Sequence, residues 1–242
     1  MAAAGSGKRL GAGGPKAFVP LAGRPMIEWS LDAFRGCESV AAVVIAAPPG
    51  HRDGLLQAGR QDLLGRDAGT EGPPVTIVDG GATRAQSVSN ALQAVETGLV
   101  AIHDAARPLI TPELIEAIVA TLESAPEAAG AIAAAPVTDT VKQAPLASRS
   151  AYSTSEVEYA PLAIESTLDR SRLWAAQTPQ VFRTEALRAA LDVEVEVRDA
   201  ATDEAMLVEA AGGTVLLHPV AAPNLKVTTP DDLQVAEMHL IR

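Results

Sequence analysis

Basic residues gather in a glycine-rich stretch at the beginning of the chain. Residues 1–27 contain Lys8, Arg9, Lys16 and Arg24 but no Asp or Glu, although the 242-residue chain carries a net charge of −11. Glycine lets a ligand approach the backbone closely, and successive N–H groups form a concave site for anions. Lys and Arg add charge-assisted hydrogen bonds to phosphate oxygens. The stretch therefore predicts a local anion site on an acidic protein.

The glycine spacing in this stretch does not match either common nucleotide-binding motif. A P-loop requires G-x-x-x-x-G-K-[ST], whereas Gly7 is followed by Lys8 and Arg9. A dinucleotide fingerprint requires G-x-G-x-x-G, but Leu10 stands where the third glycine would follow Gly5 and Gly7. On the loop alone, a phosphate cradle and a flexible N-terminus that binds nothing both stay open.

Two further segments place polar residues directly after apolar runs. Residues 79–87 combine Gly81 with Arg84 at the start of a helical pattern, and helix N-termini bind anions. Residues 102–108 place Asp104 beyond a predicted strand, where ligands of open α/β sheets bind. A carboxylate there can hold a metal on phosphates, cap a helix or pair with a nearby cation. His103 is expected to pack rather than to catalyse.

Three later positions are individually weaker candidates. Thr178 lies in Gln177-Thr178-Pro179-Gln180, and Lys226 lies in the short segment 224–228. Arg170 stands in a stretch rich in Ser, Thr, Glu and Arg. Each has a structural alternative, because Arg170 suits a solvated surface and Lys226 suits the end of a strand.

Composition limits the class of protein. The chain is 48% hydrophobic, largely Ala and Val, with only 3% aromatic residues, which suits helices packed on a sheet. The single Cys37 excludes an internal disulfide and indicates a reduced, cytoplasmic chain. No apolar run reaches about 18 residues, so no spanning helix or membrane partner is expected. No signal peptide is evident. The negative net charge disfavours a nucleic-acid-binding surface.

Apolar runs alternate with amphipathic ones along the chain. This alternation predicts an α/β fold with a mainly parallel sheet and helices on both faces. The expected strands are residues 40–47, 75–78, 99–103, 130–137 and 214–217. The expected helices are residues 26–35, 83–96, 112–125, 202–211 and 230–241. Residues 52–74 are expected to form a surface helix and loop, and residues 138–173 a protruding hairpin arm.

Read in order, these segments resemble the 2-C-methyl-D-erythritol 4-phosphate cytidylyltransferase family over nearly the whole chain. The ordered set of motifs is far more specific than any one of them. The motifs are Ala3-Ala4-Gly5-x-Gly7-x-Arg9 with Pro15-Lys16, Asp79-Gly80-Gly81-x-x-Arg84-x-x-Ser87, His103-Asp104-Ala105-Ala106-Arg107-Pro108, Ala135-Pro136-Val137-x-Asp139-Thr140-x-Lys142, Gln177-Thr178-Pro179-Gln180, Thr202-Asp203-Glu204-Ala205 and Asn224-x-Lys226-Val227-Thr228.

The resemblance implies a Rossmann-like nucleotidyltransferase fold, with one cytidylyltransferase domain over residues 1–242 and a dimerisation arm at about residues 138–173. It implies transfer of CMP from CTP to methylerythritol phosphate, giving CDP-methylerythritol and pyrophosphate in the non-mevalonate isoprenoid pathway. It also implies a homodimer in which Thr140 and Arg170 act across the subunit interface, with Lys226, to position methylerythritol phosphate.

The resemblance assigns roles to individual residues. It implies that Arg9 and Lys16 stabilise charge on the phosphates, and that Mg²⁺ or another divalent cation lies on the triphosphate with Asp104 nearby. The residues it implies as catalytic are Arg9, Lys16, Arg170 and Lys226. The residues it implies for substrate binding are Ala3, Ala4, Gly5, Gly7, Gly81, Arg84, Ser87, Ala105, Arg107, Thr140 and Thr178.

The chain departs from the family pattern at several points. Met1 directly precedes Ala2-Ala3 where the family has an apolar first strand, so that strand is expected to be absent. Ala17 stands where Gln is frequent and Ala82 where an acidic residue is common. The arm is also longer than usual, which affects the register that places Arg170.

Three alternative functions stay open on the sequence. A ribitol-5-phosphate cytidylyltransferase shares the fold and nucleotide, although Ala105-Ala106 and residues 202–205 favour the methylerythritol enzyme. A dinucleotide-dependent oxidoreductase needs an acidic residue about 20 positions after the glycines. Glu28 has that spacing but falls within a predicted helix. A non-catalytic nucleotide-binding protein would bind CTP without releasing pyrophosphate.

Overall fold

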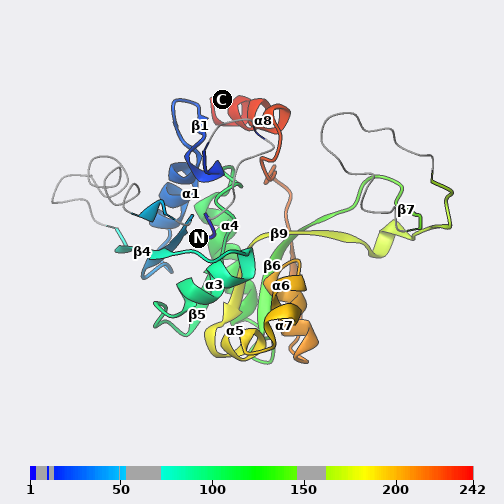
Figure 1. Ribbon diagram of the computed structural model, residues 1–242. Coiled ribbons are helices and arrows are strands. Elements are labelled where there is room, and N and C mark those ends of the chain that lie inside the picture. The colour runs from blue at the N-terminus through cyan, green and yellow to red at the C-terminus, as the bar shows by residue number, and fades with distance from the viewer. Residues whose placement is uncertain (4–9, 11–13, 49, 53–71, 146–161, 242) are drawn as a thin grey trace.

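The computed structural model describes the chain except residues 4–9, 11–13, 49, 53–71, 146–161 and 242, which Figure 1 draws as a thin grey trace. Most of the expected surface segment 52–74 lies outside the described residues. No helix in the described part of the chain has the length and apolar character needed to cross a bilayer.

The centre of the protein is a β-sheet of two ladders. One ladder has the order β10 (Val215–Pro219), β6 (Gly130–Pro136), β9 (Trp174–Arg183) and β5 (Leu99–Ile102). The other pairs β3 (Val43–Ala47) with β4 (Val75–Asp79) in parallel. β10 runs parallel to β6, whereas β9 runs antiparallel to both β6 and β5. The mainly parallel sheet is therefore confirmed, with β9 as the strand of opposite direction.

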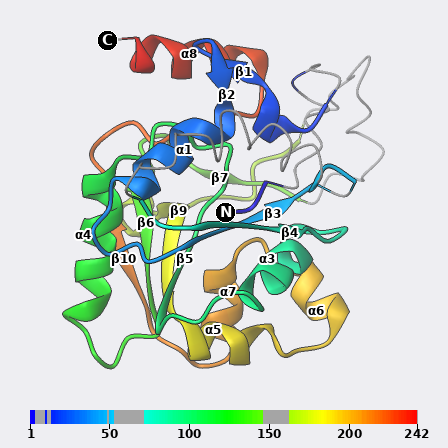
Figure 2. The ribbon, with the colours of Figure 1, turned by 90° about the vertical axis from the view of Figure 1, so that its left-hand side faces the viewer.

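The first residues of the chain join the two ladders. Ala2 forms parallel bridges to Ala46 and to Asp104. Its N–H donates to the His103 carbonyl at 2.8 Å, and its own carbonyl accepts from Ala105 N–H at 3.2 Å. Although the sequence predicts no first strand, Ala2 thus connects β3 with the residue range that follows β5, and the N label in Figure 2 marks this segment beside β3.

An apolar cavity of about 570 Å³ is lined by Met1 and by residues of both ladders. Residues of β3, β5 and helix α3 (Arg84–Leu92) line it, among them Val43, Val100 and Val88. The Met1 amine donates to the Val44 carbonyl at 2.6 Å at the edge of this cavity. Hydrogen bonds of Ala2 thus join the two ladders near Asp104, whereas a cavity lies between them beside Met1.

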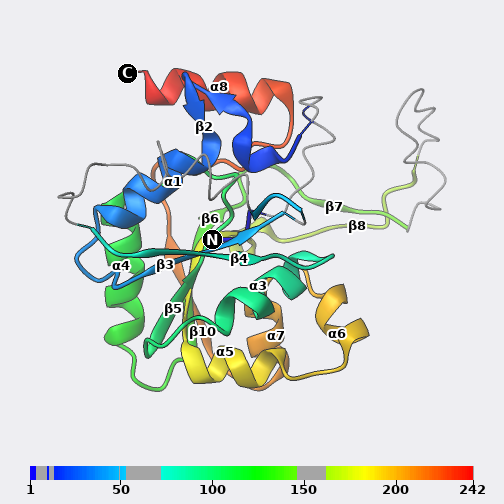
Figure 3. The same cartoon turned by 60° about the vertical axis from the view of Figure 1, so that its left-hand side comes forward.

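Helices cover both faces of the sheet, as the alternation predicts (Figure 3). Helices α1 (Met26–Arg35) and α4 (Pro112–Glu123) lie on one face, and α3, α5 (Thr184–Leu191) and α7 (Glu204–Ala210) lie on the other. Side chains of successive strand residues point to opposite faces. Accordingly, Val181 packs with the α4 cluster, and Phe182 packs with the cluster of α3, α5 and α7. Fully burying such a side chain stabilises the fold by about 1.5–3 kcal/mol.

The helix starts follow from the sequence more closely than the helix ends. Thr83 and Thr111 are the N-caps of α3 and α4, and each accepts a hydrogen bond from a backbone N–H in the first turn. However, α3 ends at Leu92, well before residue 96, and α4 ends at Glu123. The Gln86 side chain accepts from Ala82 N–H at 3.0 Å, so it folds back onto the loop before the cap.

Several described elements were not expected. The strand β9 contains Pro179, and a proline inside an apolar run argues against a strand in sequence terms. The helices α5 and α6 (Val195–Ala200) follow it closely. A small hairpin of β1 (Pro20–Leu21) and β2 (Arg24–Pro25) packs with α8 (Pro230–Leu240), and Leu21, Met26 and Val227 are buried between them.

The expected arm projects from the body (Figure 1). β6 and β9 stay paired as far as Pro136 and Trp174. The hairpin then continues through β7 (Lys142–Gln143) and β8 (Ser166–Thr167), which pair antiparallel. The arm therefore extends two central strands, and the pairing of β6 with β9 fixes its base.

Candidate active site

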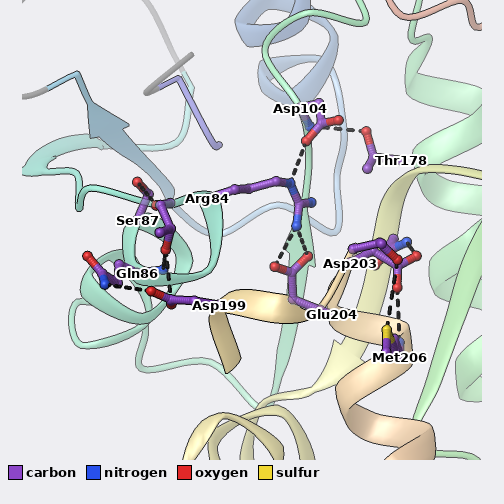
Figure 4. Close-up of polar contacts among 12 residues, drawn as sticks. Arg84, Gln86, Ser87, Asp104, Thr178, Asp199, Asp203, Glu204 and Met206 are labelled. Carbon is purple, nitrogen blue, oxygen red and sulfur yellow. Dashed lines mark hydrogen bonds and ion pairs between the residues drawn. The ribbon is translucent and has the colours of Figure 1, made fainter. Parts of the chain in front are cut away.

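Asp104 is the centre of a polar cluster at the carboxyl end of β5. Its Oδ1 accepts from Arg84 Nε at 3.0 Å, and its Oδ2 accepts from Lys226 Nζ at 2.7 Å. Its backbone N–H donates to the Thr178 hydroxyl at 3.0 Å. Four of the residues selected from the sequence thus meet, although they come from four separate segments. Figure 4 shows three of them, Arg84, Asp104 and Thr178. This is the edge of the sheet at which α/β proteins bind ligands.

Arg84 links Asp104 to a second carboxylate. Its Nη1 donates to both oxygens of Glu204, at 2.6 and 2.7 Å, while its Nε faces Asp104 (Figure 4). The Glu204 side chain is 1% exposed and that of Lys226 is 43% exposed. The charges alternate along Glu204, Arg84, Asp104 and Lys226, so the buried end is a carboxylate and the solvent end is a cation.

This arrangement controls protonation. Burial alone would raise the pKa of Asp104, but the charges and hydrogen bonds of Arg84 and Lys226 hold that pKa well below its usual range. Burial raises the pKa of Glu204, and the Arg84 charge opposes this rise. Burial would lower the pKa of Arg84, but the two carboxylates raise it further above its ordinary value. Asp104 and Arg84 are therefore both charged at neutral pH.

His103 lies in the interior and contacts the cluster through Thr178. It is fully buried, its Nδ1 lies 3.1 Å from the Thr178 hydroxyl and its Nε2 lies 3.3 Å from the Arg107 carbonyl. Because the Thr178 hydroxyl accepts from Asp104 N–H, its own proton is assigned to His103 Nδ1. Burial lowers the pKa of His103 to about 3, so the ring is neutral. His103 packs in the interior, as the sequence predicts, and the structure shows in addition that it orients Thr178.

The segment that carries Lys226 is fixed by backbone and side-chain bonds. Val227 N–H donates to the Ala106 carbonyl at 2.8 Å. The buried Arg107 donates from Nη1 to the Asn224 carbonyl at 2.6 Å. Asn224 in turn donates from Nδ2 to the Thr178 carbonyl at 2.9 Å. The Arg107 side chain therefore holds the segment of Lys226, and its backbone N–H donates to the Asp104 carbonyl at 2.9 Å.

The loop before α3 requires glycine at position 81. A Cβ there would lie 2.3 Å from Gln86 Cβ, so a larger residue would force the loop apart. Gly81 N–H donates to Ser87 Oγ at 3.0 Å, and Ser87 Oγ donates to the Thr83 carbonyl at 2.8 Å. Because Ser87 is fully buried, its hydroxyl shapes this loop from the inside.

The beginning of the chain is described only in part. Ala4, Gly5, Gly7 and Arg9 lie outside the described residues. Lys16 begins the short 3-10 helix η2 (Lys16–Phe18). Ala17 is buried in the same apolar cluster as Ala3 and Ala105. A small residue after Lys16 thus fits the packing, which accounts for the departure from Gln at this position.

The two arm residues are not brought to this cluster. Thr140 is exposed, and Arg170, in the 3-10 helix η5 (Arg170–Arg172), is exposed and donates from Nη1 to the Thr138 carbonyl. Among the described residues, no hydrogen bond or ion pair joins either of them to Asp104 or Lys226, and the arm points away from the body (Figure 1). Within one subunit, the candidate residues fall into two separate groups.

Sequence reasoning missed three residues that organise the site. Glu204 holds Arg84, Asn224 holds the Lys226 segment, and Asp199 accepts from Thr83 Oγ1 and Gln86 Nε2 ahead of α3. Glu204 and Asn224 stand in the motifs quoted above, so their presence was a signal. Their partners lie more than 40 positions away, and spacing along the chain does not reveal such pairs.

The fold and the cluster define a nucleotidyltransferase of the Rossmann-like class, with cations and one ionised carboxylate at the ligand edge of the sheet. Comparison with known protein families identifies the particular family within this class. The sequence profile of IspD, 2-C-methyl-D-erythritol 4-phosphate cytidylyltransferase, matches residues 1–242, and the chain belongs to this family.

Individual relatives agree with this assignment. The 2-C-methyl-D-erythritol 4-phosphate cytidylyltransferase of Synechococcus elongatus is 39% identical over 240 residues, which cover 98% of this chain and 93% of the relative. That of Frankia casuarinae is 40% identical over 242 residues, covering 99% of this chain and 79% of the relative. The crystal structure of the Thermus thermophilus enzyme matches with a TM-score of 0.68 and 32% identity, covering 94% of each chain.

Proposed function

We propose that this protein transfers CMP from CTP to 2-C-methyl-D-erythritol 4-phosphate in the isoprenoid pathway. A phosphate oxygen of methylerythritol phosphate attacks the α-phosphorus of CTP. The bond between the α-phosphorus and the bridging oxygen to the β-phosphorus breaks, and pyrophosphate leaves with that oxygen. The products are CDP-methylerythritol and pyrophosphate. The family membership of the whole chain supports the reaction.

The observation that carries the proposal is the set of cations around Asp104. The two substrates together bring about six negative charges into one site. Two unit charges a few ångström apart repel by about 4 kcal/mol at an effective dielectric constant near 20. Phosphoryl-type transfer needs positioning and neutralisation of charge more than covalent help from the protein. Lys226, partly exposed and held on Asp104, and Arg84 supply fixed N–H donors at this edge of the sheet. Asp104 and Glu204 balance their charge, so the net positive charge for the phosphates is left to Arg9 and Lys16.

The remaining roles follow the family pattern and stay part of this proposal. Arg9 and Lys16 stabilise the charge that builds on the phosphates in the transition state. Thr140, Arg170 and Lys226 position methylerythritol phosphate. The residues for cytosine and ribose have small side chains or a buried hydroxyl, which permit close backbone approach; they are Ala3, Ala4, Gly5, Gly81, Ser87 and Ala105.

Asp104 is the residue that would hold a divalent cation such as Mg²⁺. Its carboxylate is ionised, and Mg²⁺ in nucleotide sites commonly binds one or two carboxylates together with substrate phosphates. No group of three potential metal-binding side chains occurs among the described residues, so most ligands would come from the triphosphate and water. When bound, the cation would neutralise charge on the triphosphate. Each Asp104 oxygen faces one protein cation here, and a carboxylate oxygen has a second lone pair that the metal ion would use.

We propose that the protein works in the cytoplasm as a homodimer in which each arm completes the partner's site. The arm exposes large apolar side chains, which on a soluble surface commonly mark a protein interface. They are Leu162, Ile164, Leu168 and Trp174. The separation of Thr140 and Arg170 from Asp104 within one subunit also supports a shared site.

A pyrophosphate-release assay with purified protein, CTP and methylerythritol phosphate tests the reaction. We expect release that requires both substrates and is much slower with ATP, GTP or UTP. Ribitol 5-phosphate in place of methylerythritol phosphate tests the closest alternative. Binding of CTP without pyrophosphate release, or faster turnover of ribitol 5-phosphate, would refute the proposal.

Mixing two impaired variants, assayed at a methylerythritol phosphate concentration well below the native KM, tests the shared site. In a heterodimer of Lys16→Ala and Arg170→Ala subunits, one of the two sites has both native residues if the arm acts in trans. We expect the re-associated mixture to regain roughly a quarter of the native activity, because about half of the dimers are mixed. No recovery in a mixture shown to contain heterodimers would place Arg170 in its own subunit's site.

A further inference from the structure

Glu204 is a buried carboxylate that the proposed transfer does not use. It is the first residue of α7, and Asp203 before it caps the helix by accepting from Met206 N–H. Both Glu204 oxygens accept from a single nitrogen of Arg84. Burying a carboxylate is costly unless it is paired, so this position needs a reason beyond helix formation.

The Arg84 guanidinium has a choice of partners at this site. An isolated Arg–carboxylate pair favours the bidentate geometry, in which two N–H groups face two oxygens of one carboxylate. Arg84 does not adopt it with Asp104. Among the contacts of the described residues only its Nε reaches Asp104, at Oδ1, and the hold of Glu204 on Nη1 fixes the guanidinium in this orientation. Asp104 Oδ2 is thereby left for Lys226 Nζ at 2.7 Å.

We propose that Glu204 is a positioning residue for the incoming phosphomonoester, acting through Arg84 and Asp104 on Lys226. By holding Nη1, Glu204 keeps the guanidinium from rotating Nη2 onto Asp104 Oδ2, and Asp104 then holds the Lys226 ammonium where the substrate phosphate binds. The inference rests on the proposed function, because it assigns Lys226 to the phosphate of methylerythritol phosphate.

The proposal and a purely electrostatic effect predict opposite changes in the KM for methylerythritol phosphate. Replacing Glu204 by Gln adds one positive charge to the cluster, and a more positive site would attract both phosphate substrates more strongly. If position is what matters, Arg84 closes on Asp104, Lys226 loses its fixed place and the phosphomonoester binds more weakly. The sign of the change in KM therefore separates positioning from charge.

The experiment compares Glu204→Gln and Glu204→Asp with the native chain in the pyrophosphate assay. We expect the KM for methylerythritol phosphate to rise about tenfold in Glu204→Gln, the usual scale for loss of an outer partner, and the KM for CTP to rise less than about threefold. Glu204→Asp keeps the charge but shortens the side chain, so its KM for methylerythritol phosphate should also rise. Glu209→Gln, an exposed position on the same helix, is the matched control.

Three results would overturn the inference. They are an unchanged or lower KM for methylerythritol phosphate in Glu204→Gln, an equal rise in Glu209→Gln, and a fall in melting temperature with no change in KM. If Glu204→Gln does not fold, Glu204→Asp carries the same test. Native turnover in the same assay is measured first, so failure of the reaction itself is distinguished from failure of the inference.

Discussion

The body and the arm of this protein present their cations in opposite ways. Arg84 in the body is held by two carboxylates and is largely buried, and Lys226 is held by Asp104. Arg170 in the arm is exposed, and it donates to the Thr138 carbonyl at the base of the same arm. The body therefore has its charges in place before any ligand binds, whereas the charge of Arg170 in the arm is exposed to solvent and to any molecule that contacts the arm.

This difference suggests a division of work between the two regions. Prearranged charge costs no reorganisation at the moment of reaction and lowers the barrier most effectively. A cation on a projecting hairpin is better suited to hold a substrate between two subunits. We therefore expect changes at Asp104 and Lys16 in the body to alter stability and turnover, and changes in the arm to alter apparent affinity alone.

The largest expected effect is on stability, at the centre of the body cluster. Asp104→Asn leaves Arg84 and Lys226 without their shared carboxylate, and loss of one partner of a buried pair costs about 3 kcal/mol. For a chain of this size the melting temperature should fall by about 6–12 °C, measured by calorimetry. The matched control is Asp79→Asn, which breaks the exposed Arg52–Asp79 pair and should cost less than about 0.5 kcal/mol. Equal losses in the two variants would show that the cluster contributes no more than a surface pair.

The next effect is on turnover, through the N-terminal cation that begins η2. Lys16→Ala should lower kcat by at least about 10²-fold, the scale for removing one prearranged donor to a transition state. Arg9→Ala should act similarly. Arg52→Ala, which removes an exposed cation paired with Asp79, serves as the control in the same pyrophosphate assay. Near-native kcat in Lys16→Ala would contradict the role given to the body.

The sequence predicts the parts of the molecule that local chemistry determines. Helix α1 occupies the expected residues 26–35, and α3 and α4 begin within one residue of the expected positions, directly after their N-caps Thr83 and Thr111. What it does not predict depends on contacts across the fold. Strand β9 forms despite Pro179 because the proline lies at a register shift, between the pairs Gln180–Ile132 and Ala176–Ala134, where the ladder needs no N–H from it.

The candidate site shows the same limit. Asp104, Arg84, Thr178 and Lys226 were selected from motifs, and they meet because the sheet brings strand ends together. Glu204 lies 120 positions from Arg84, and its motif read equally well as the start of a helix. Arg9 was selected from the glycine loop, and its role stays a prediction because that loop lies outside the described residues.

A smaller effect on stability is expected from the chain's first amine. Burial lowers the pKa of the Met1 amine to about 5 from 8.0, so the unfolded chain binds more protons between these values. Stability should therefore rise with pH in this window, by about 2 kcal/mol between about pH 6 and pH 8. Denaturant unfolding of the native chain and of N-terminally acetylated protein measures this difference, since His103 contributes equally to both. The same pH dependence in both proteins would show that the amine is not buried.

The smallest expected effect belongs to the arm. Arg170→Ala should raise the KM for methylerythritol phosphate about tenfold, or about 1.4 kcal/mol, with a much smaller change in the KM for CTP. The stability of the body should not change, because Arg170 is exposed. Arg172→Ala, two positions further in the same short helix, is the control for a general loss of charge. A larger rise in the KM for CTP would mean that the arm residue contacts the nucleotide instead.

The central claim is that CTP binds at the edge of the sheet between the N-terminal cations and the Asp104 cluster. A crystal structure with CTP and a divalent cation tests it most directly. We predict triphosphate oxygens within hydrogen-bonding distance of Lys16, the cytidine against Gly81 and Ala105, and a free approach to the α-phosphorus from the side of Lys226. A nucleotide bound elsewhere on the protein, away from Lys16 and Asp104, would contradict the account.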